Sequence, residues 1–370
     1  MYSFLILVLL IIVFLALHYR INTITFDGYR PRVSAIYCSL FASNSIPDYP
    51  IIFVPGIKGS LLEKDGELVW LTARNTFYSK STSPLVLHSD DGVATVGVFT
   101  RLVSIPVFFE YRGYHRISAD LACMSHGYTF HYDWRKAPED IIPELDALVS
   151  RVAQETGKKP AIIAHSYGGV IVRGYSQNEY NRLGPIVYVG TPFDPGPDYL
   201  IHDLTKGSSV FFNKTLTTAP VIVSHDSSYY LIPHKGSPLY RERDVMNATT
   251  WKEYALGPYA YDPTYSLSRL QERLDRAVAY QQTMRAPFKG TNPVLVVYNN
   301  EIRTMHSVLP GGEVEYALGD GRVDGEAAQP SGINKEQITL LERPERHSQQ
   351  LQTKEALADI YSFISNAVTD

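Results

Sequence analysis

The stretch 160–170 constrains the fold of this chain more than any other part of it. An apolar run over 161–164 is followed by Ser166, which has small residues two positions away on both sides, and a helix-compatible segment begins at Gly168. This is the G-x-S-x-G pattern with Ala164 in its first position. It is typical of a strained turn that lifts a serine hydroxyl above a sheet, with a helix N-terminus behind it to stabilise an oxyanion. Ser166 is therefore the candidate nucleophile, and an ordinary strand–turn–helix junction is the alternative.

A nucleophile of this kind needs an acid and then a histidine later in the chain. Residues 338–342 have the pattern of a short strand, a loop with His347 follows, and a helix over 354–366 closes the chain. Upstream, Asp320 lies between two glycines, in a tight turn that can aim a carboxylate without steric bulk. We expect Asp320 to hold His347 in the tautomer that accepts the proton of Ser166.

Other acids and histidines compete for these roles. His165 is adjacent to the serine, but successive residues point apart, so we interpret it as a packing residue. Asp324 lies close to Asp320 and is the alternative acid, whereas Asp194 and Asp198 are interpreted as turn or helix-start residues. The remaining histidines form no pair at metal-ligand spacing, so we predict no metal and no organic cofactor.

The apolar run 51–54 is typical of a buried central strand. Pro55-Gly56 ends it and turns the chain, so that the backbone N–H of Ile57 or Lys58 can face the serine. With the N–H of Tyr167, that makes the two-donor oxyanion hole that such a nucleophile requires. We favour Ile57 over Lys58 as the first donor, and a simple strand-end turn is the alternative.

Five further segments follow one another between about residue 51 and the C-terminus. They are Ile51–Glu63 (IIFVPGIKGSLLE), Val69-Trp70-Leu71, Tyr132-Asp133-Trp134-Arg135, Ser227–Pro233 (SSYYLIP) and Gly319–Val323 (GDGRV). With the serine motif, they resemble the strand and oxyanion loop, the Y-D-W-R tetrapeptide, the serine-rich stretch and the acid turn of the lecithin:cholesterol acyltransferase family, which includes phospholipid:diacylglycerol acyltransferases. Two positions depart from that pattern: Ala164 stands for glycine, and Arg322 for the usual threonine.

The resemblance implies an α/β-hydrolase fold and an O-acyltransferase or lipase that acts on phospholipid or neutral lipid esters through an acyl-serine. Its partners would be the lipid substrate and a membrane surface. The triad itself does not choose between transfer and hydrolysis. Trp70 is interpreted either as an apolar wall of the acyl site or as core, and Asp133 is expected to pair with Arg135. The alternative functions are an esterase or deacylase for other esters, and a non-catalytic lipid-binding protein tethered to a membrane.

Strands and helices alternate along the chain as a mostly parallel sheet with helices on both faces demands. We predict an α/β-hydrolase domain over 49–370, with lid or cap insertions at about 61–121 and 193–293, because connections that long commonly carry function. The remaining elements are expected at 129–132, 186–192 and 294–298 (strands) and at 139–156 and 267–284 (helices).

Charge and cysteine content narrow the possible partners. The 34 basic and 38 acidic residues are well mixed and give a net charge of −4, with no basic stripe, so we expect no nucleic acid partner. Cys38 and Cys123 allow at most one disulfide, and we expect both to be free.

The N-terminal segment is apolar throughout 4–17. That length lies between a signal-peptide core of roughly 7–15 residues and a membrane span of roughly 20. We predict an uncleaved membrane anchor over 1–20, followed by a juxtamembrane linker over 21–48; cleavage would instead give a secreted protein. Arginines 20, 30 and 32 follow the segment and favour a cytosolic catalytic domain.

Overall fold

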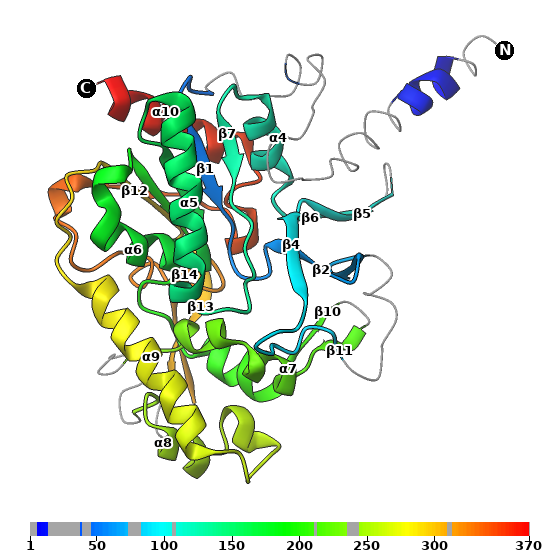
Figure 1. The fold of residues 1–370 in the computed structure, drawn as a ribbon, viewed down its shortest axis with the longest axis vertical. Coiled ribbons are helices and arrows are strands. Elements are labelled where there is room, and N and C mark those ends of the chain that lie inside the picture. Colours follow the sequence, from blue (N-terminus) through cyan, green and yellow to red (C-terminus); the bar gives the residue numbers. More distant parts are fainter. Residues whose placement is uncertain are drawn as a thin grey trace.

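The computed structural model describes residues 6–13, 38, 46–72, 83–105, 109–210, 213–234, 244–308 and 313–369. Its centre is a sheet with helices around it (Figure 1). This sheet has six strands in the order β15-β12-β9-β8-β1-β7, and every neighbouring pair is parallel. The strands are β1 (Ile51–Val54), β7 (Gly127–Thr129), β8 (Ala161–His165), β9 (Ile186–Val189), β12 (Val294–Tyr298) and β15 (Ile338–Glu342). The expected α/β-hydrolase fold is therefore confirmed.

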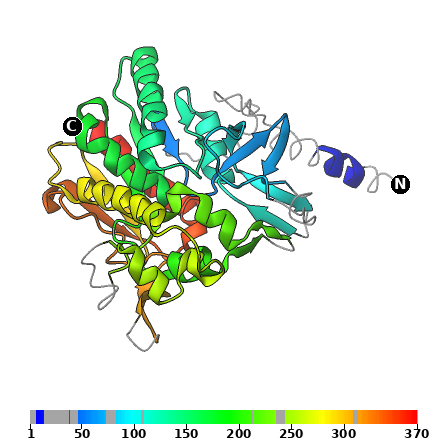
Figure 2. The ribbon, with the colours of Figure 1, turned by 60° about the horizontal axis from the view of Figure 1, so that its bottom comes forward.

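Alternation along the strands divides the core into two layers, because successive side chains point to opposite faces. Ile52 and Val54 pack into the larger layer with α5, α6 and α9, whereas Ile51 and Phe53 pack into the smaller one with α4 and α10. Figure 2 shows α9, in yellow, beside the green helices that cover the larger layer. The helices are α4 (His115–Cys123), α5 (Pro138–Thr156), α6 (Tyr167–Glu179), α9 (Leu267–Arg285) and α10 (Lys354–Thr369).

Helix α5 illustrates how the local sequence sets the ends of these helices. It begins with Pro138, and Glu139 and Asp140 lie in its first turn, where their negative charges face the positive end of the helix dipole. Its C-cap is Gly157, which has the left-handed φ of 67° that glycine adopts at little cost. The predicted helix over 139–156 is confirmed.

Two predicted strands end earlier than expected. The strand predicted over 129–132 is found at Gly127–Thr129, and the chain leaves the ladder there; the N–H of Tyr132 is bound by the Ser60 hydroxyl at 3.1 Å instead of by a strand. Strand β9 ends at Val189, because Gly190 has a φ of 53° and turns the chain away. In both places tertiary packing decides the boundary.

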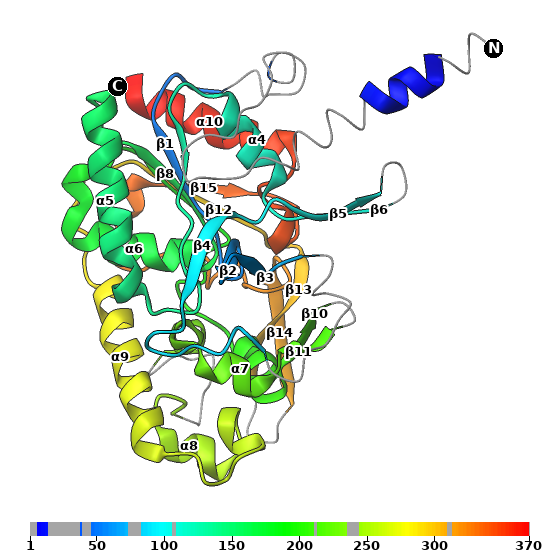
Figure 3. The ribbon, with the colours of Figure 1, turned by 45° about the vertical axis from the view of Figure 1, so that its right-hand side comes forward.

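The insertion after β1 forms small antiparallel sheets (Figure 3). They contain β2 (Ser60–Lys64), β3 (Glu67–Trp70) and β4 (Val93–Val98), followed by β5 (Arg101–Ile105) and β6 (Phe109–Arg112). The insertion after β9 is built from short elements and ends with α9. These are the π-helix η2 (Tyr199–Leu204), β10 (Ser208–Val210), β11 (Asn213–Thr217), α7 (Ala219–Ser224), the 3₁₀ helix η3 (Asp226–Leu231), α8 (Ala248–Glu253) and the 3₁₀ helix η5 (Gly257–Ala260).

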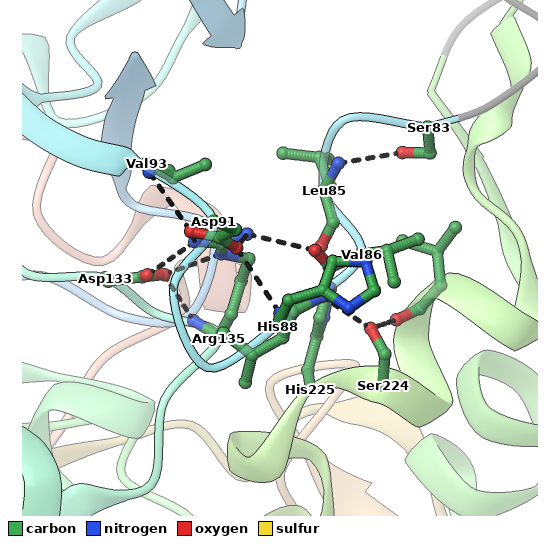
Figure 4. A network of polar contacts seen from close by, with 12 residues as sticks. Ser83, Leu85, Val86, His88, Asp91, Val93, Asp133, Arg135, Ser224 and His225 are labelled. Atoms are coloured by element: carbon green, nitrogen blue, oxygen red, sulfur yellow. Dashed lines mark hydrogen bonds and ion pairs between the residues drawn. The ribbon is translucent and has the colours of Figure 1, made fainter. Parts of the chain in front are cut away.

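A buried arginine joins the first insertion to the loop after β7 (Figure 4). The fully buried Arg135 donates to Asp133 at 2.9 and 2.7 Å, as expected, and to Asp91 at 2.7 Å. Beside it, His225 Nε2 donates to the carbonyl oxygen of Leu85 at 2.8 Å. A buried guanidinium without acceptors would be costly, so the two carboxylates fix this segment in place.

The N-terminal anchor prediction is wrong. Within the described ranges, no helix has both the length and the apolar character needed to cross a bilayer. The described part of 1–20 is a short helix over 6–13, and the rest of 1–20 lies outside the described residues. Most of the predicted linker over 21–48 also lies outside the described residues.

The prediction of free cysteines is also wrong. Cys38 and Cys123 form a disulfide with their Cα atoms 5.5 Å apart. The two residues are separated by 85 positions in sequence, and no local pattern indicates that the end of α4 lies beside Cys38. The bond ties this upstream position to the smaller helical layer.

Candidate active site

Ser166 lies in a strained turn between β8 and α6, with φ 53° and ψ −123°. The turn is possible because two glycines follow it closely. A Cβ atom on Gly168 would lie 2.4 Å from the carbonyl oxygen of Pro55, and one on Gly169 would lie 1.9 Å from Thr191 Oγ1. Gly168 and Gly169 thus allow α6 to pack closely against the ends of the neighbouring strands.

The structure brings the three predicted triad side chains together. His347 Nε2 lies 2.9 Å from Ser166 Oγ, and His347 Nδ1 lies 2.7 Å from Asp320 Oδ2. Ser166 follows β8, His347 follows β15, and Asp320 follows the hairpin of β13 (Ile302–Val308) and β14 (Val314–Gly319). These geometries are those of a nucleophile, a base and an orienting acid.

Asp320 is almost completely buried and is held by its own turn. Its Oδ1 accepts the backbone N–H groups of Val323 at 2.8 Å and Arg322 at 2.9 Å, and its carbonyl oxygen accepts the N–H of His347 at 3.0 Å. Burial by itself would raise the pKa of Asp320, but His347 and the backbone donors outweigh it and lower the pKa below its ordinary value. The carboxylate therefore stays ionised beside the imidazole.

The alternative acid, Asp324, lies in a different environment. Its Oδ1 accepts the N–H groups of Glu326 and Ala327 at 3.1 and 2.8 Å, and its Oδ2 lies 3.2 Å from His306 Nδ1. These contacts shape the turn that follows the acid loop. Asp324 is therefore turned to its own loop, and Asp320 is the acid in contact with His347.

His165 does more than pack. Its Nε2 donates to the carbonyl oxygen of His347 at 2.9 Å, because a carbonyl can only accept. Its Nδ1 must then accept the hydroxyl proton of Tyr114 at 2.7 Å, and the oxygen of Tyr114 accepts the N–H of Gly56 at 2.8 Å. Burial and the nearby His347 lower the pKa of His165 to about 3, so this ring is neutral.

The predicted oxyanion donors stand close to the nucleophile. Gly56 packs so tightly that a Cβ on it would lie 2.9 Å from Ser166 Cβ, and its N–H is already bound by Tyr114. Ile57 comes next and lines the cavity at Ser166, while Tyr167 is the first residue of α6, where N–H groups have no partner within the helix. The oxyanion role of Ile57 and Tyr167 stays a prediction.

A cavity of about 870 Å³ opens at Ser166, within the size range of small-molecule sites. Trp70, Leu71, Phe99 and Leu231 contribute apolar side chains to it. Trp70 is buried, donates from Nε1 to the carbonyl oxygen of Lys58 at 2.9 Å and packs edge-on against Trp134. It therefore both lines the cavity and belongs to the core.

The cavity also has a charged side that the sequence analysis did not identify. Lys58, Asp198, Asp203 and Arg322 line it and contact one another. In the sequence analysis, Arg322 was noted only as a departure from a family motif, and Asp198 only as a turn or helix-start residue. Among the residues that the structure describes, no cluster of His, Cys, Asp or Glu is arranged to hold a metal ion.

The comparisons with known proteins give distant likenesses. No family model matches the chain. An uncharacterized protein of Saccharomyces cerevisiae is 24% identical over 299 residues, covering 74% of this chain and 44% of its own length, so the chain spans less than half of that relative.

Among solved structures, a similar fold occurs in the Tle4–Tli4 complex, with 10% identity and a TM-score of 0.49 over 86% of this chain and 99% of that one. The mature form of the Bacillus licheniformis lipase BlEst2 is 12% identical, with a TM-score of 0.38 over 87% of this chain and 94% of that one. A monoacylglycerol lipase of Paleococcus ferrophilus is 13% identical with a TM-score of 0.35, over 86% and 94% of the two chains. None of these names points to the lecithin:cholesterol acyltransferase family, and at these TM-scores the assignment of a function rests on the site itself.

Proposed function

We propose that the chain is a serine esterase or lipase that cleaves carboxylic esters through an acyl-enzyme on Ser166. The observation that carries this proposal is the unbroken contact from Ser166 through His347 to Asp320, in the lining of a cavity of about 870 Å³. A strained nucleophile, a base at hydrogen-bond distance and a buried ionised acid together form the arrangement that acyl transfer requires.

In the first half of the reaction, Ser166 Oγ attacks the ester carbonyl carbon while its proton moves to His347 Nε2. The carbonyl oxygen becomes an oxyanion, for which the N–H groups of Ile57 and Tyr167 are the proposed donors. The tetrahedral intermediate then collapses, the bond to the alkoxy oxygen breaks, and His347 gives its proton to the departing alcohol. The acyl group remains on Ser166.

In the second half, His347 takes a proton from water or from another alcohol, whose oxygen attacks the acyl carbon. The tetrahedral intermediate then collapses, the bond from the acyl carbon to Ser166 Oγ breaks, and His347 returns its proton to Ser166 Oγ. Asp320 holds the imidazole by its Nδ1–H and stabilises its charged form in both halves. Transfer to an alcohol rather than hydrolysis is the finer proposal. The family resemblance in the five motifs supports it, and the apolar side chains of the cavity support a fatty acyl donor.

The experiment that tests the proposal is covalent labelling with a fluorophosphonate probe. Folded wild type should take up the probe, Ser166→Ala should not, and Ser268→Ala, an exposed serine at the start of α9, should label like wild type. Folding of each variant is checked by circular dichroism. A folded wild type that takes up no probe would show that the chain is not a serine acyl-enzyme.

A further inference from the structure

One side of the cavity is formed by charged residues from three separate segments, which we call the polar wall (Lys58, Asp198, Asp203 and Arg322). Lys58 follows the proposed oxyanion donor Ile57, and Arg322 lies two residues after Asp320. Asp198 and Asp203 come from the segment of η2, in the second insertion. The polar wall is therefore attached directly to both loops of the proposed catalytic machinery.

Asp203 joins the members of the wall. Its Oδ1 lies 3.5 Å from Lys58 Nζ, and its Oδ2 lies 3.4 Å from Arg322 Nη2. Arg322 Nη1 also contacts Asp198 Oδ2, and Lys58 Nζ also contacts Ser208 Oγ at 3.5 Å. The side chain of Asp203 is only 6% exposed, whereas that of Lys58 is 22% and that of Arg322 47% exposed. The hub is thus buried and the two cations face the cavity.

These contacts are poorly suited to stabilising the fold alone. Charges taken out of water repay their desolvation only when the geometry is close and hydrogen bonds satisfy the remaining donors. Here the links made by Asp203 are long, and burial lowers the pKa of Lys58 in spite of Asp203 beside it. An ammonium and a guanidinium carry three and five N–H donors. Such a wall has donors and acceptors to offer to a ligand in the cavity.

The charge balance indicates which ligand suits it. Lys58 and Arg322 are matched by Asp198 and Asp203, so an added anion would gain little from the cations and be repelled by the carboxylates. A hydroxyl group, in contrast, accepts from the cations and donates to the carboxylates at once. Arg346 also lines the cavity, so a phosphate group is the competing ligand to be tested.

We propose that the polar wall binds a neutral, hydroxyl-rich alcohol, such as a sugar or a cyclic polyol, as the alcohol half of the ester or as the acyl acceptor. This inference rests on the proposed function. Lys58 and Arg322 line the same cavity as Ser166 and His347, so a polyol held at the wall lies in the cavity in which the acyl-enzyme forms. The bound polyol would then compete with water for the acyl-enzyme.

The test measures this competition. The donor is p-nitrophenyl butyrate, whose leaving group lacks polyol character, and p-nitrophenol release reports formation of the acyl-enzyme. The added acceptors are paired by size: glycerol with 1-propanol, and myo-inositol with cyclohexanol. The ratio of butyrate ester to butyric acid, quantified by chromatography, measures how well each acceptor captures the acyl group, and it is independent of the rate of the first step.

We expect glycerol to capture the acyl-enzyme about tenfold better per mole than 1-propanol, and inositol similarly better than cyclohexanol, as two or more added hydrogen bonds would give. Arg322→Gln and Asp203→Asn should abolish most of this preference. Arg151→Gln, which removes an arginine from a partly exposed ion pair on α5, should preserve it.

Equal capture of paired alcohols, with p-nitrophenol release intact, would overturn the inference and leave the proposed function standing. Glycerol 3-phosphate is added as a further acceptor. A tenfold preference for it over glycerol would also overturn the inference, in favour of an anion site. If folded wild type releases no p-nitrophenol, the proposed function fails, and the inference with it.

Discussion

His165 and His347 are joined by a hydrogen bond of 2.9 Å from the His165 ring to the His347 backbone, and their rings lie 4.8 Å apart. The residue before the proposed nucleophile thus positions the proposed base through its main chain. The hydroxyl of Tyr114 extends this contact to Gly56, at the start of the oxyanion loop. A single chain of hydrogen bonds therefore connects the proposed oxyanion loop at Gly56 to the loop that carries His347.

Tyr114→Phe should lower kcat by about tenfold with little change in KM, because the N–H of Gly56 and the Nδ1 of His165 lose their shared partner. The measurement is steady-state hydrolysis of p-nitrophenyl butyrate. Tyr175→Phe is the matched control, since its hydroxyl donates to Asp146 at 2.8 Å on the helices α5 and α6. An unchanged kcat in Tyr114→Phe, with only stability reduced, would mean that Tyr114 is merely structural.

Exchanging each acid for its amide should distinguish the roles of Asp320 and Asp324. Asp320→Asn would present the wrong hydrogen-bonding group to His347 Nδ1 and should reduce kcat by about 10³–10⁴-fold. Asp324→Asn keeps an oxygen for the N–H groups of Glu326 and Ala327 and should reduce kcat by less than about tenfold. The reverse order of effects would identify Asp324 as the functional acid.

Acid should destabilise the fold through two buried histidines. Burial, aided by neighbouring positive groups, lowers the pKa of His165 and of His225 from 6.5 to about 3. At pH values between these two pKa values, the unfolded chain binds protons that the folded chain does not. The free energy of unfolding therefore decreases as the pH falls. Each histidine contributes about 1.4 kcal/mol per pH unit.

Urea denaturation at pH values from 7 to 4 measures this slope. His165→Gln should show a shallower decline than wild type over the same range, whatever its absolute stability. An identical slope in the two proteins would mean that His165 takes up its proton in the folded state.

Cys123→Ser should lower the free energy of unfolding by about 2–5 kcal/mol, because the disulfide to Cys38 closes a long loop in the unfolded chain. Equilibrium denaturation with and without reductant checks this value. Wild type under reducing conditions should behave like the variant, and reductant should not affect Cys123→Ser. A wild type whose stability is insensitive to reductant would contradict the bond.

The sequence predicts the parts of the site that are encoded locally. Ser166 is recognised by the small residues its turn requires, and Asp320 and His347 by a glycine turn and by a position after a late strand. The structure brings these three side chains into contact, and the labelling and amide variants above test their roles.

The missed features depend on contacts between residues far apart in sequence. Gly56 and Tyr114 are 58 positions apart, and Lys58 and Asp203 are 145 apart. Gly56 and Lys58 lie in the loop after β1, Tyr114 directly precedes α4, and Asp203 lies in η2, so no periodicity links these positions and predicts that they are neighbours. The anchor prediction failed for a different reason: it rested on apolar composition alone, and no helix in the described part of the chain has the length that a bilayer requires.

The edge position of β15 affects when the site is assembled. His347 follows this outermost strand and comes 181 residues after Ser166. During synthesis Ser166 and the proposed oxyanion loop are made long before His347, and in the described sheet β15 pairs with β12, which is itself a late strand. While those 181 residues are made, the nascent chain carries Ser166 without its proposed base, and the proposed triad is complete only after β15 has joined the sheet.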